Sequence, residues 1–457
     1  MTAKHARRRT ARHLGALALV ALVLSGCFGR VAPAPTDVDF TATPSGTLRA
    51  WAFDNADDIG EARLTDARDQ LPGVRIELDQ TGFNAQKFTT RLASGDVPDV
   101  VQMDRQFVAN YAAQRLIMPL DRCYDAAGVD PAERFYPNVL GDITYDDQLW
   151  AVPQFFQPPA IIVNQRVLDA AGVAASDIDT SRPDVLLAAI AKLYRSDGGT
   201  PTRLGFDPVA TGQANLWVLG LGGRLVGPDG RPTLDDPRNA YALELLRRIT
   251  DAQGGYAQLK SFADTFDAFG EDNQFVRDQV AAQIDAQWYL NVLAPYASDL
   301  DIRTVPFRDR DGEPVTVTGG TAYVVPARAR NPAAACAWAQ RLTTVDDWAV
   351  AGAARQATLA DEGGFNTGIF TGSPAADREL RTQNVRPTGS VGFDQSIAAF
   401  YDVAGAGLTF GASPAGEAIA RDLANAVASV CLGDETATQA LADAQRSSLQ
   451  AYETATR

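Results

Sequence analysis

Hydrophobic and polar positions follow two alternating periods over residues 46–116. Short apolar runs typical of strands occur at 46–51, 74–78 and 100–103. Between and after these runs, apolar residues recur three or four positions apart, which predicts amphipathic helices. Strands that alternate with helices form βαβ units, and such units build a parallel sheet covered by helices on both faces. The pattern therefore predicts an α/β unit in the first part of the chain.

Further along the chain the pattern is mostly helical. A hairpin turning on Asp146-Asp147 comes first, because both aspartates lie between short apolar runs. Further short strands are predicted at 160–163, 302–307, 314–317 and 321–325. Helices are predicted at 183–194, 214–221, 239–251, 275–279, 332–342, 415–430 and 436–452. A folded part of about 410 residues exceeds the usual size of one domain, so we expect two lobes.

The first 27 residues have the three zones of an export signal. A basic zone precedes an apolar run from Leu14 to Leu24, and Ser25-Gly26-Cys27 follows. The apolar run is too short to span a bilayer. Leu24-Ser25-Gly26-Cys27 resembles the bacterial lipobox, which implies cleavage before Cys27 and attachment of diacylglycerol to its sulfur. A plain signal peptide with an incidental cysteine is the alternative.

These features predict a lipoprotein. We expect a signal peptide over 1–26, lipidation at Cys27 and a flexible linker over 27–46, which is rich in proline and threonine. Two or three acyl chains anchor a protein stably. The expected location is therefore the cell membrane, lipid-anchored, on its extracytoplasmic face. No later segment is apolar enough to cross a membrane.

Removal of residues 1–26 changes the charge of the chain. Five basic residues leave, so 36 basic residues face 56 acidic ones and the formal charge becomes −20. Such a chain repels nucleic acid and anionic lipid. Both histidines, His5 and His13, leave as well. This excludes Ser-His-Asp and Cys-His catalysis and removes the commonest zinc ligand, so we expect no metal and no cofactor.

Three cysteines remain beyond the signal: Cys123, Cys336 and Cys431. They are far apart and contain no CxxC pair, which argues against a metal cluster or a thioredoxin-type motif. An exported protein permits one disulfide with one cysteine left over. The sequence does not say which pair forms.

A series of motifs in order along the chain resembles one family. The motifs are Val97-Pro98-Asp99-Val100 with the following Asp104-Arg105, Trp150-Ala151-Val152-Pro153, Ile161-Ile162-Val163-Asn164, Asp285-Ala286-Gln287-Trp288 and Val317-Thr318-Gly319-Gly320. Together they resemble the extracellular solute-binding proteins of ABC importers, in the sugar-binding family that includes maltose-binding protein. The resemblance covers roughly residues 46 to 455.

This resemblance implies an α/β fold of the type II periplasmic-binding-protein kind. Two lobes, each a mostly parallel sheet flanked by helices, would close on a ligand around a hinge. Lobe 1 is expected to comprise residues 47–155 and 316–362, and lobe 2 residues 156–315 and 363–457. The partners implied are a small-molecule ligand, the permease subunits of the importer and the membrane, with no nucleic acid; a monomer is expected.

The resemblance also implies ligand-binding positions. Asp104 and Arg105 would bond sugar hydroxyls from lobe 1, Trp288 would stack on a sugar ring, and Gly320 would let backbone approach the ligand. Gln157 stands where the maltose-type sequence has a carboxylate, so the ligand or its orientation is expected to differ. Two weaker candidates are Trp51, at the end of the first strand, and Arg386. Core packing of Trp51 or Trp288, and capping of a helix by Asp104, are the structural alternatives.

The expected function is therefore capture of a mono- or oligosaccharide without catalysis. A lipoprotein carbohydrate-active enzyme with paired carboxylates is one alternative. A binder of a cationic or peptide ligand is another, since a cation would match the charge of −20.

Overall fold

The structure, a computed structural model, describes residues 38–53, 57–208 and 213–457. These residues belong to one compact unit, 34–457. The predicted signal peptide, Cys27 and residues 28–37 of the predicted linker lie outside the described residues. Within the described part of that linker, Phe40 is buried and packs in a core cluster with Leu48 and Trp338.

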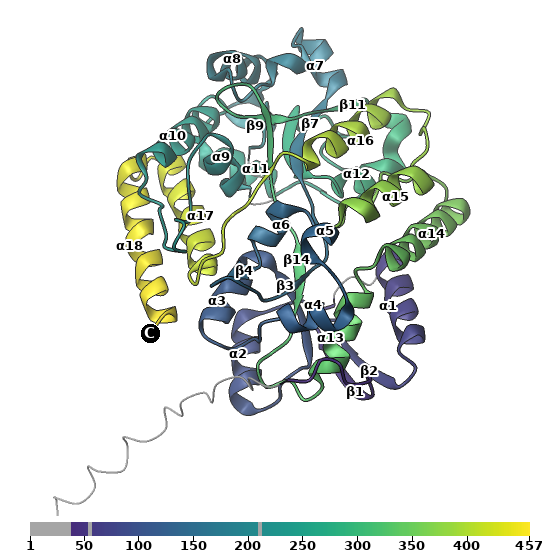
Figure 1. The fold of residues 1–457 in the computed structure, drawn as a ribbon. Coiled ribbons are helices and arrows are strands. Elements are labelled where there is room, and N and C mark those ends of the chain that lie inside the picture. The colour runs from purple at the N-terminus through teal and green to yellow at the C-terminus, as the bar shows by residue number, and fades with distance from the viewer. Residues whose placement is uncertain (1–37, 54–56, 209–212) are drawn as a thin grey trace, which may run out of the picture. The chain divides into compact units, whose positions relative to one another are not determined.

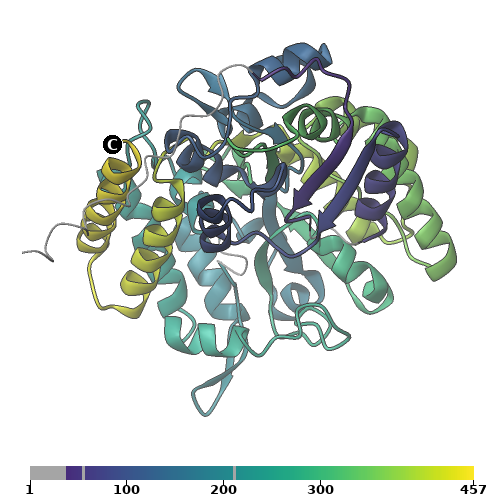
Figure 2. The ribbon, with the colours of Figure 1, turned by 90° about the horizontal axis from the view of Figure 1, so that it is seen from below.

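A five-stranded mixed sheet forms one half of the unit. Its strands are β1 (Gly46–Trp51), β2 (Val74–Asp79), β3 (Val100–Asp104), β6 (Val152–Pro153) and β14 (Thr321–Val324), in the order β2-β1-β3-β14-β6. β1 is parallel to β2 and β3, and β14 is antiparallel to β3 and β6. Figure 2 shows β1 and β2 side by side in purple, near α1 (Asp58–Gln70). The βαβ pattern thus forms the parallel strands β2, β1 and β3, and β14, from much later in the chain, adds to this sheet in the antiparallel direction.

A second sheet surrounds one fully buried strand. β7 (Pro159–Asn164) lies between β10 (Ala282–Ala286) and β11 (Ile302–Val305), and both neighbours are antiparallel to it. The expectation of a mostly parallel sheet in this half is therefore wrong. β7 begins where the chain leaves the first sheet and runs away from that point, whereas β10 runs back and ends beside Pro159. Apolar periodicity predicts strands but does not give their direction.

Three smaller strand groups complete the β structure. β12 (Phe307–Arg308), β13 (Pro314–Val317) and β15 (Gly407–Leu408) form one sheet. The remaining two are hairpins: β4 (Thr144–Tyr145) with β5 (Gln148–Leu149), and β8 (Arg195–Asp197) with β9 (Thr200–Arg203). The first hairpin turns on Asp146 and Asp147, both with positive φ, as expected from the sequence.

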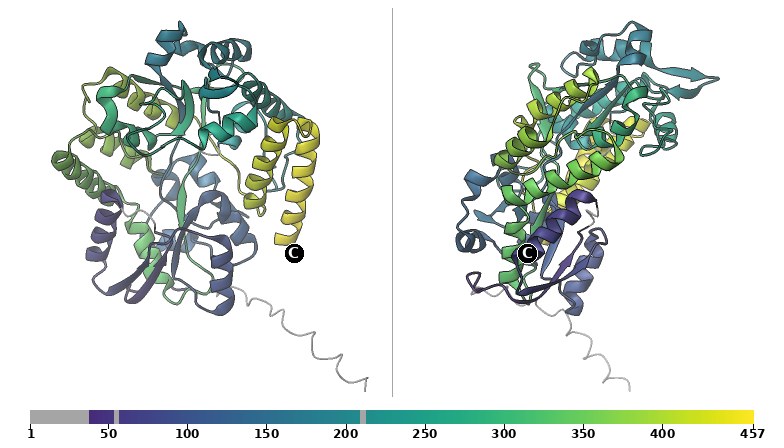
Figure 3. Two further views of the ribbon diagram at one scale, coloured as in Figure 1. Left: turned by 180° about the vertical axis from the view of Figure 1, so that it is seen from behind. Right: turned by 90° about the vertical axis from the view of Figure 1, so that its right-hand side faces the viewer.

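Helices pack around these sheets (Figure 1). Besides α1 they are α2 (Ala85–Ser94), α3 (Val108–Ala113), α4 (Asp121–Ala127), α5 (Pro131–Arg134), α6 (Pro137–Gly141), α7 (Gln165–Ala171), α8 (Pro183–Leu193), α9 (Ala214–Gly220), α10 (Pro237–Asp251), α11 (Tyr256–Ala263), α12 (Tyr289–Leu293), α13 (Pro332–Arg341), α14 (Val345–Glu362), α15 (Pro374–Asn384), α16 (Val391–Ala404), α17 (Gly416–Leu432) and α18 (Ala437–Ala455). Figure 3 shows α17 and α18, in yellow, side by side. In the described part of the chain, no helix is long and apolar enough to cross a bilayer.

One predicted helix is wrong. Residues 275–278 form turns instead, and Asp278 has a φ of 53°. The Asp278 carboxylate accepts hydrogen bonds from Asn164 Nδ2 at 2.9 Å and from Arg166 Nη2 at 2.7 Å. These partners come from β7 and α7, so tertiary contacts stabilise a left-handed backbone where local spacing predicted a helix.

The structure decides the cysteine pairing that the sequence left open. Cys123 of α4 and Cys336 of α13 form a disulfide, and Cys431 of α17 is free and buried. The disulfide joins residues 213 positions apart. It lies in the core cluster that covers the first sheet.

Candidate functional site

Three of the expected site residues meet where the chain passes from the first sheet to the second. The N–H of Arg105 donates to the Gly320 carbonyl at 3.1 Å. The N–H of Gln157 donates to the Gly319 carbonyl at 2.9 Å, and its side chain is half-buried. The segment after β6 and the segment before β14 are therefore tied together beside the end of β3.

Arg105 is a structural link at this junction. Its side chain is 1% exposed and reaches Asp142 Oδ2 at 3.4 Å. It also donates to the carbonyls of Thr318, at 3.2 Å, and Phe155. Asp142 accepts further hydrogen bonds from Thr318 Oγ1 and Thr409 Oγ1. The Arg105 guanidinium therefore donates to protein acceptors from several segments, and a buried guanidinium needs such partners.

Gly320 is required for close backbone packing at the same place. Its φ is 148°, and a Cβ added there would lie 2.0 Å from the Phe155 carbonyl oxygen. The space beside this glycine is therefore filled by the protein's own backbone.

The other expected site residues outside the cavity described below are Trp51, Asp104 and Arg386. Trp51 is fully buried, and its Nε1 donates to Thr81 Oγ1 at 3.2 Å. Asp104 is exposed at the end of β3, and its side chain does not cap the following turn. Arg386 is exposed and donates to carbonyls at the end of α15, including Thr382 at 2.9 Å. The capping alternative for Asp104 is therefore not what the structure shows.

Trp288 lies in a cavity of about 380 Å³, within the size range of small-molecule sites. The cavity is bounded by α11, β10 and α17 and by the segment 264–274. Its polar lining residues are Asp207, Tyr256, Lys260, Asp264, Gln274, Gln283, Asp285, Trp288 and Tyr289, and its apolar lining includes Phe266, Phe269 and Leu259. None of the other expected site residues lines it.

Strand β10 positions the inner wall of this cavity. Gln283 and Asp285 lie two residues apart on β10, so both side chains leave the same face of the strand. Asp207 forms a bridge with Gln283, and its N–H donates to the Ala282 carbonyl at 2.8 Å. Trp288 follows the strand after one residue, Gln287, and precedes Tyr289, the first residue of α12.

A chain of hydrogen bonds connects the polar groups of this wall. Gln274 Nε2 donates to Gln283 Oε1 at 2.9 Å and to the Tyr289 hydroxyl at 2.8 Å. Gln283 Nε2 donates to Asp285 Oδ2 at 2.8 Å. The Ala286 N–H donates to Asp285 Oδ1, also at 2.8 Å. The side chains of the wall are therefore held in defined orientations before any ligand binds.

Asp285 is 1% exposed, and burial raises its pKa to about 7. The charge of Asp207 raises the pKa further, whereas the hydrogen bonds from Gln283 and from the backbone oppose the rise. A carboxyl group with such a pKa, lining a cavity, is typical of binding and catalytic sites.

An aromatic pair lies at the opening of the cavity. Phe269 is 71% exposed, and its ring stacks on Trp288 at 6.1 Å between centroids with 12° between the planes. Trp288 also meets Tyr289 edge to face at 5.6 Å. Trp288 therefore packs on one side and lines the cavity on another, so packing and ligand contact do not exclude each other.

Sequence reasoning selected Trp288 but missed the carboxylate and amide wall. Asp285 stands in the motif Asp285-Ala286-Gln287-Trp288, and had residues 282–286 been predicted as a strand, its two-residue spacing from Gln283 would have indicated a shared face. Gln274 and Phe269 have no comparable signal, because they lie in turns whose path depends on tertiary contacts. Among the described residues, no group of acidic, cysteine or histidine side chains is arranged to hold a metal ion.

The fold and this cavity define a class of protein: a two-lobed α/β solute-binding protein. A sequence profile of the family described as bacterial extracellular solute-binding protein matches residues 63–347, more than half of the chain. The chain belongs to this family, and the expected two-lobed α/β fold is confirmed. Membership of an extracellular family implies that the protein works outside the cytoplasm. No curated protein matches the sequence.

Solved structures share the fold at low sequence identity. The mannobiose-bound CpMnBP1 is 20% identical with a TM-score of 0.70, covering 88% of this chain and 99% of that one. An ABC substrate-binding protein from Listeria monocytogenes in complex with cycloalternan is 16% identical, with a TM-score of 0.70 and coverage of 89% and 98%. UgpB from Mycobacterium tuberculosis in complex with glycerophosphocholine is 18% identical, with a TM-score of 0.65 and coverage of 90% and 99%.

Proposed function

We propose that this protein captures a carbohydrate in the cavity beside Trp288 and delivers it, chemically unchanged, to the permease of an ABC importer. The observation that carries the proposal is the combination of one aromatic face with carboxylate and amide groups in a single cavity. A pyranose presents a flat C–H face to an aromatic ring, while its hydroxyls bond to planar polar side chains.

The similar structures support a sugar as the ligand class. CpMnBP1 is solved with mannobiose, and the Listeria protein is solved with cycloalternan. The glycerophosphocholine complex of UgpB shows that the same fold also holds a different kind of polar ligand. The carbohydrate assignment therefore rests on the lining of this chain's own cavity together with these likenesses.

Calorimetric titration of the purified full chain with mono- and oligosaccharides tests the proposal. We expect stoichiometric binding, with no product detectable by chromatography. Trp288→Ala is expected to weaken binding at least tenfold because a buried aromatic contact contributes more than about 1.4 kcal/mol. Trp288→Phe keeps an aromatic face and is the matched control. Sugar cleavage would overturn the proposal in favour of an enzyme, and equal affinity of Trp288→Ala would overturn the assignment of the site.

Closure of two lobes is part of the proposal. Lobe 1 comprises residues 47–155 and 316–362, and lobe 2 residues 156–315 and 363–457, with the Arg105 junction between them. Asp104, at the carboxyl end of β3, would face the ligand from lobe 1 upon closure. Small-angle scattering is expected to show a monomer whose radius of gyration is smaller with bound sugar than without it.

The proposal also includes a lipid anchor at Cys27. Its basis is the lipobox-like sequence and the extracellular family. Metabolic labelling with palmitate should mark the wild-type protein and not Cys27→Ala. Persistent labelling of the variant would contradict the anchor without affecting sugar capture.

A further inference from the structure

Most hydrogen-bond donors on the inner wall of the Trp288 cavity are used within the protein. Both N–H groups of Gln274 already donate, to Gln283 Oε1 and to the Tyr289 hydroxyl. The Tyr289 hydroxyl donates in turn to the Ala268 carbonyl at 2.9 Å. Gln283 Nε2 donates to Asp285. Both N–H groups of Gln274, the Tyr289 hydroxyl and one of the two N–H groups of Gln283 are thus directed at protein acceptors, and the carboxylate of Asp285 can only accept when it is ionised.

One acceptor in this wall is left without a partner. Gln274 is 1% exposed, and its Oε1 atom makes no hydrogen bond in the structure. A buried acceptor without a donor is costly, and such groups in native proteins usually have a functional reason. Since Gln274 lines the cavity, a donor carried by a ligand would satisfy it.

The cavity also carries an excess of negative charge. Among the described residues that line it, three are aspartates and one, Lys260, is basic. Lys260 Nζ already bonds to Asp264 Oδ1. Asp285 receives hydrogen bonds from the Gln283 amide and the Ala286 N–H, and it forms no ion pair with any residue that the structure describes. A ligand that brings positive charge would offset the desolvation of Asp285, which a neutral ligand does not do.

Aromatic residues complete a surface suited to a cation. Trp288, Tyr256 and Phe269 line the same cavity as the aspartates. Aromatic faces attract a positively charged nitrogen through their quadrupole and at the same time cover the apolar face of a sugar ring.

We infer that the solute is an amino sugar, a pyranose bearing a protonated primary amine that donates to the Gln274–Asp285 wall while its ring packs on Trp288. This inference rests on the proposed capture of a carbohydrate and specifies its class. The ammonium group supplies three donors and one positive charge, which are what the inner wall lacks. A neutral hydroxyl supplies a single donor and no charge.

Matched triples of sugars test this inference on the purified full chain. Each triple holds the ring and linkage constant and changes one substituent between ammonium, hydroxyl and acetamide: glucosamine, glucose and N-acetylglucosamine; the galactose and mannose equivalents; and deacetylated chitobiose, cellobiose and N-acetylated chitobiose. Affinities are measured by calorimetry at pH 7 and low salt. The ammonium member is expected to bind at least tenfold more tightly than its hydroxyl partner.

Two variants should shift this preference in opposite directions. Asp285→Asn keeps the shape of the side chain but removes its charge, and is expected to weaken ammonium binding about tenfold with less effect on the hydroxyl member. Lys260→Met removes the cavity's own cation from an exposed position, and is expected to strengthen ammonium binding several-fold. Asp361→Asn changes an exposed aspartate of α14 that does not line the cavity and serves as the control for net charge.

The outcomes separate this inference from the proposed function. If hydroxyl or acetamide members bind as tightly as the ammonium member in every triple that binds, the amino-sugar inference is overturned and carbohydrate capture stands. If no triple binds but another saccharide of the panel does, the amino-sugar inference is overturned and carbohydrate capture stands; if no saccharide binds, both are overturned. Because Lys260 is exposed, Lys260→Met is expected to fold even if Asp285→Asn does not. An unchanged preference for the ammonium member in Lys260→Met would also contradict the inference.

Discussion

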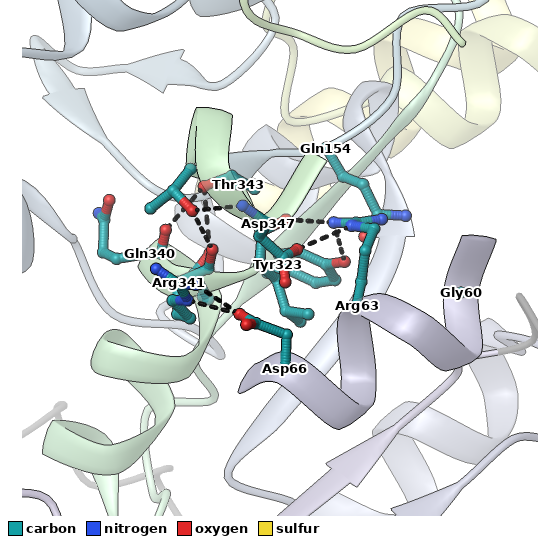
Figure 4. A network of polar contacts seen from close by, with 12 residues as sticks. Gly60, Arg63, Asp66, Gln154, Tyr323, Gln340, Arg341, Thr343 and Asp347 are labelled. Carbon is teal, nitrogen blue, oxygen red and sulfur yellow. Dashed lines mark hydrogen bonds and ion pairs between the residues drawn. The ribbon is translucent and has the colours of Figure 1, made fainter. Parts of the chain in front are cut away.

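Two buried aspartates of this protein have the same raised pKa but different surroundings. Burial raises the pKa of Asp347, on α14, and of Asp285, on β10, to about 7 in each case. Asp347 is fully buried and pairs with Arg63 Nε of α1 at 3.0 Å (Figure 4). Arg63 also lies over the ring of Trp348 at 3.6 Å and bonds to the Leu342 carbonyl. Asp285, in contrast, accepts a hydrogen bond from the Gln283 amide and lines the Trp288 cavity.

This contrast separates a structural carboxyl group from a site carboxyl group. The charge of Asp347 is compensated by Arg63 within the protein, so the energy of this pair belongs to the packing of α1 against α14, although Asp347 Oδ1 is buried without a hydrogen-bond partner. Asp285 has hydrogen bonds to both carboxylate oxygens but no counter-cation among the described residues, so a cationic ligand would supply the missing charge. Functional sites commonly carry such unfavourable electrostatics at the expense of stability.

The largest expected effect comes from breaking the compensated pair. Arg63→Met leaves Asp347 buried without its cation, and we expect the free energy of unfolding to fall by about 4 kcal/mol. Urea unfolding monitored by circular dichroism measures this change. The double variant Arg63→Met with Asp347→Leu removes both charges and should recover most of the loss. A loss below about 1 kcal/mol for Arg63→Met would show that the pair does not stabilise α1 against α14.

The same half of the molecule has a covalent constraint, the disulfide between Cys123 and Cys336. Replacing both cysteines by serine is expected to lower the free energy of unfolding by about 3 kcal/mol, because a long loop is released in the unfolded chain. Cys431→Ala, at the free buried cysteine, should cost about 1 kcal/mol and is the control. Equal losses in the two variants would contradict a stabilising role for the disulfide.

Asp285→Asn should do the opposite of Arg63→Met. The pKa of Asp285 lies above its ordinary value of 3.8, so the stability it contributes is present below pH 4 and is lost as the pH rises through about 7. At pH 8 the variant is therefore expected to be more stable than wild type by about 2 kcal/mol, after allowance for a weakened bond to Gln283.

Unfolding curves between pH 4 and 8 measure this difference, which should shrink towards pH 4. Asp347→Asn is the matched variant beside a cation: its raised pKa predicts the same pH trend, but the loss of the charged partner of Arg63 should make its gain at pH 8 smaller than that of Asp285→Asn. Destabilisation of Asp285→Asn at every pH would contradict the raised pKa of Asp285 and remove the contrast.

The smallest expected effect belongs to the opening of the cavity. Phe269→Ala removes a 71% exposed ring stacked on Trp288, so stability should change by less than about 0.5 kcal/mol. Ligand affinity should fall about two- to fivefold, the range expected for an aromatic contact worth 0.5 to 1 kcal/mol. Calorimetry with the tightest ligand measures this change. A loss of stability without a loss of affinity would assign Phe269 to packing rather than to the site.

Much of the first sheet was predictable from periodicity. The strands at 46–51, 74–78 and 100–103 correspond to β1, β2 and β3 within one residue at their ends. β10 was not predicted as a strand, and the direction of β11 was not predictable because it depends on where the chain enters the second sheet. Of the site, Trp288 followed from a motif, whereas Arg105 and Gly320, taken from the same resemblance, lie at a junction filled by protein groups.

The sequence by itself determined the features that depend on neighbouring residues or on composition. These are the alternation of strands and helices, the family, the absence of histidine beyond residue 13 and the acidic charge. The tertiary structure alone decided which cysteines pair, which aspartate meets an arginine and which one faces a cavity. The physical reason is that burial and pairing join residues far apart in the chain, such as Arg63 with Asp347 and Asp207 with Gln283. The spacing of apolar residues along the sequence does not predict such contacts.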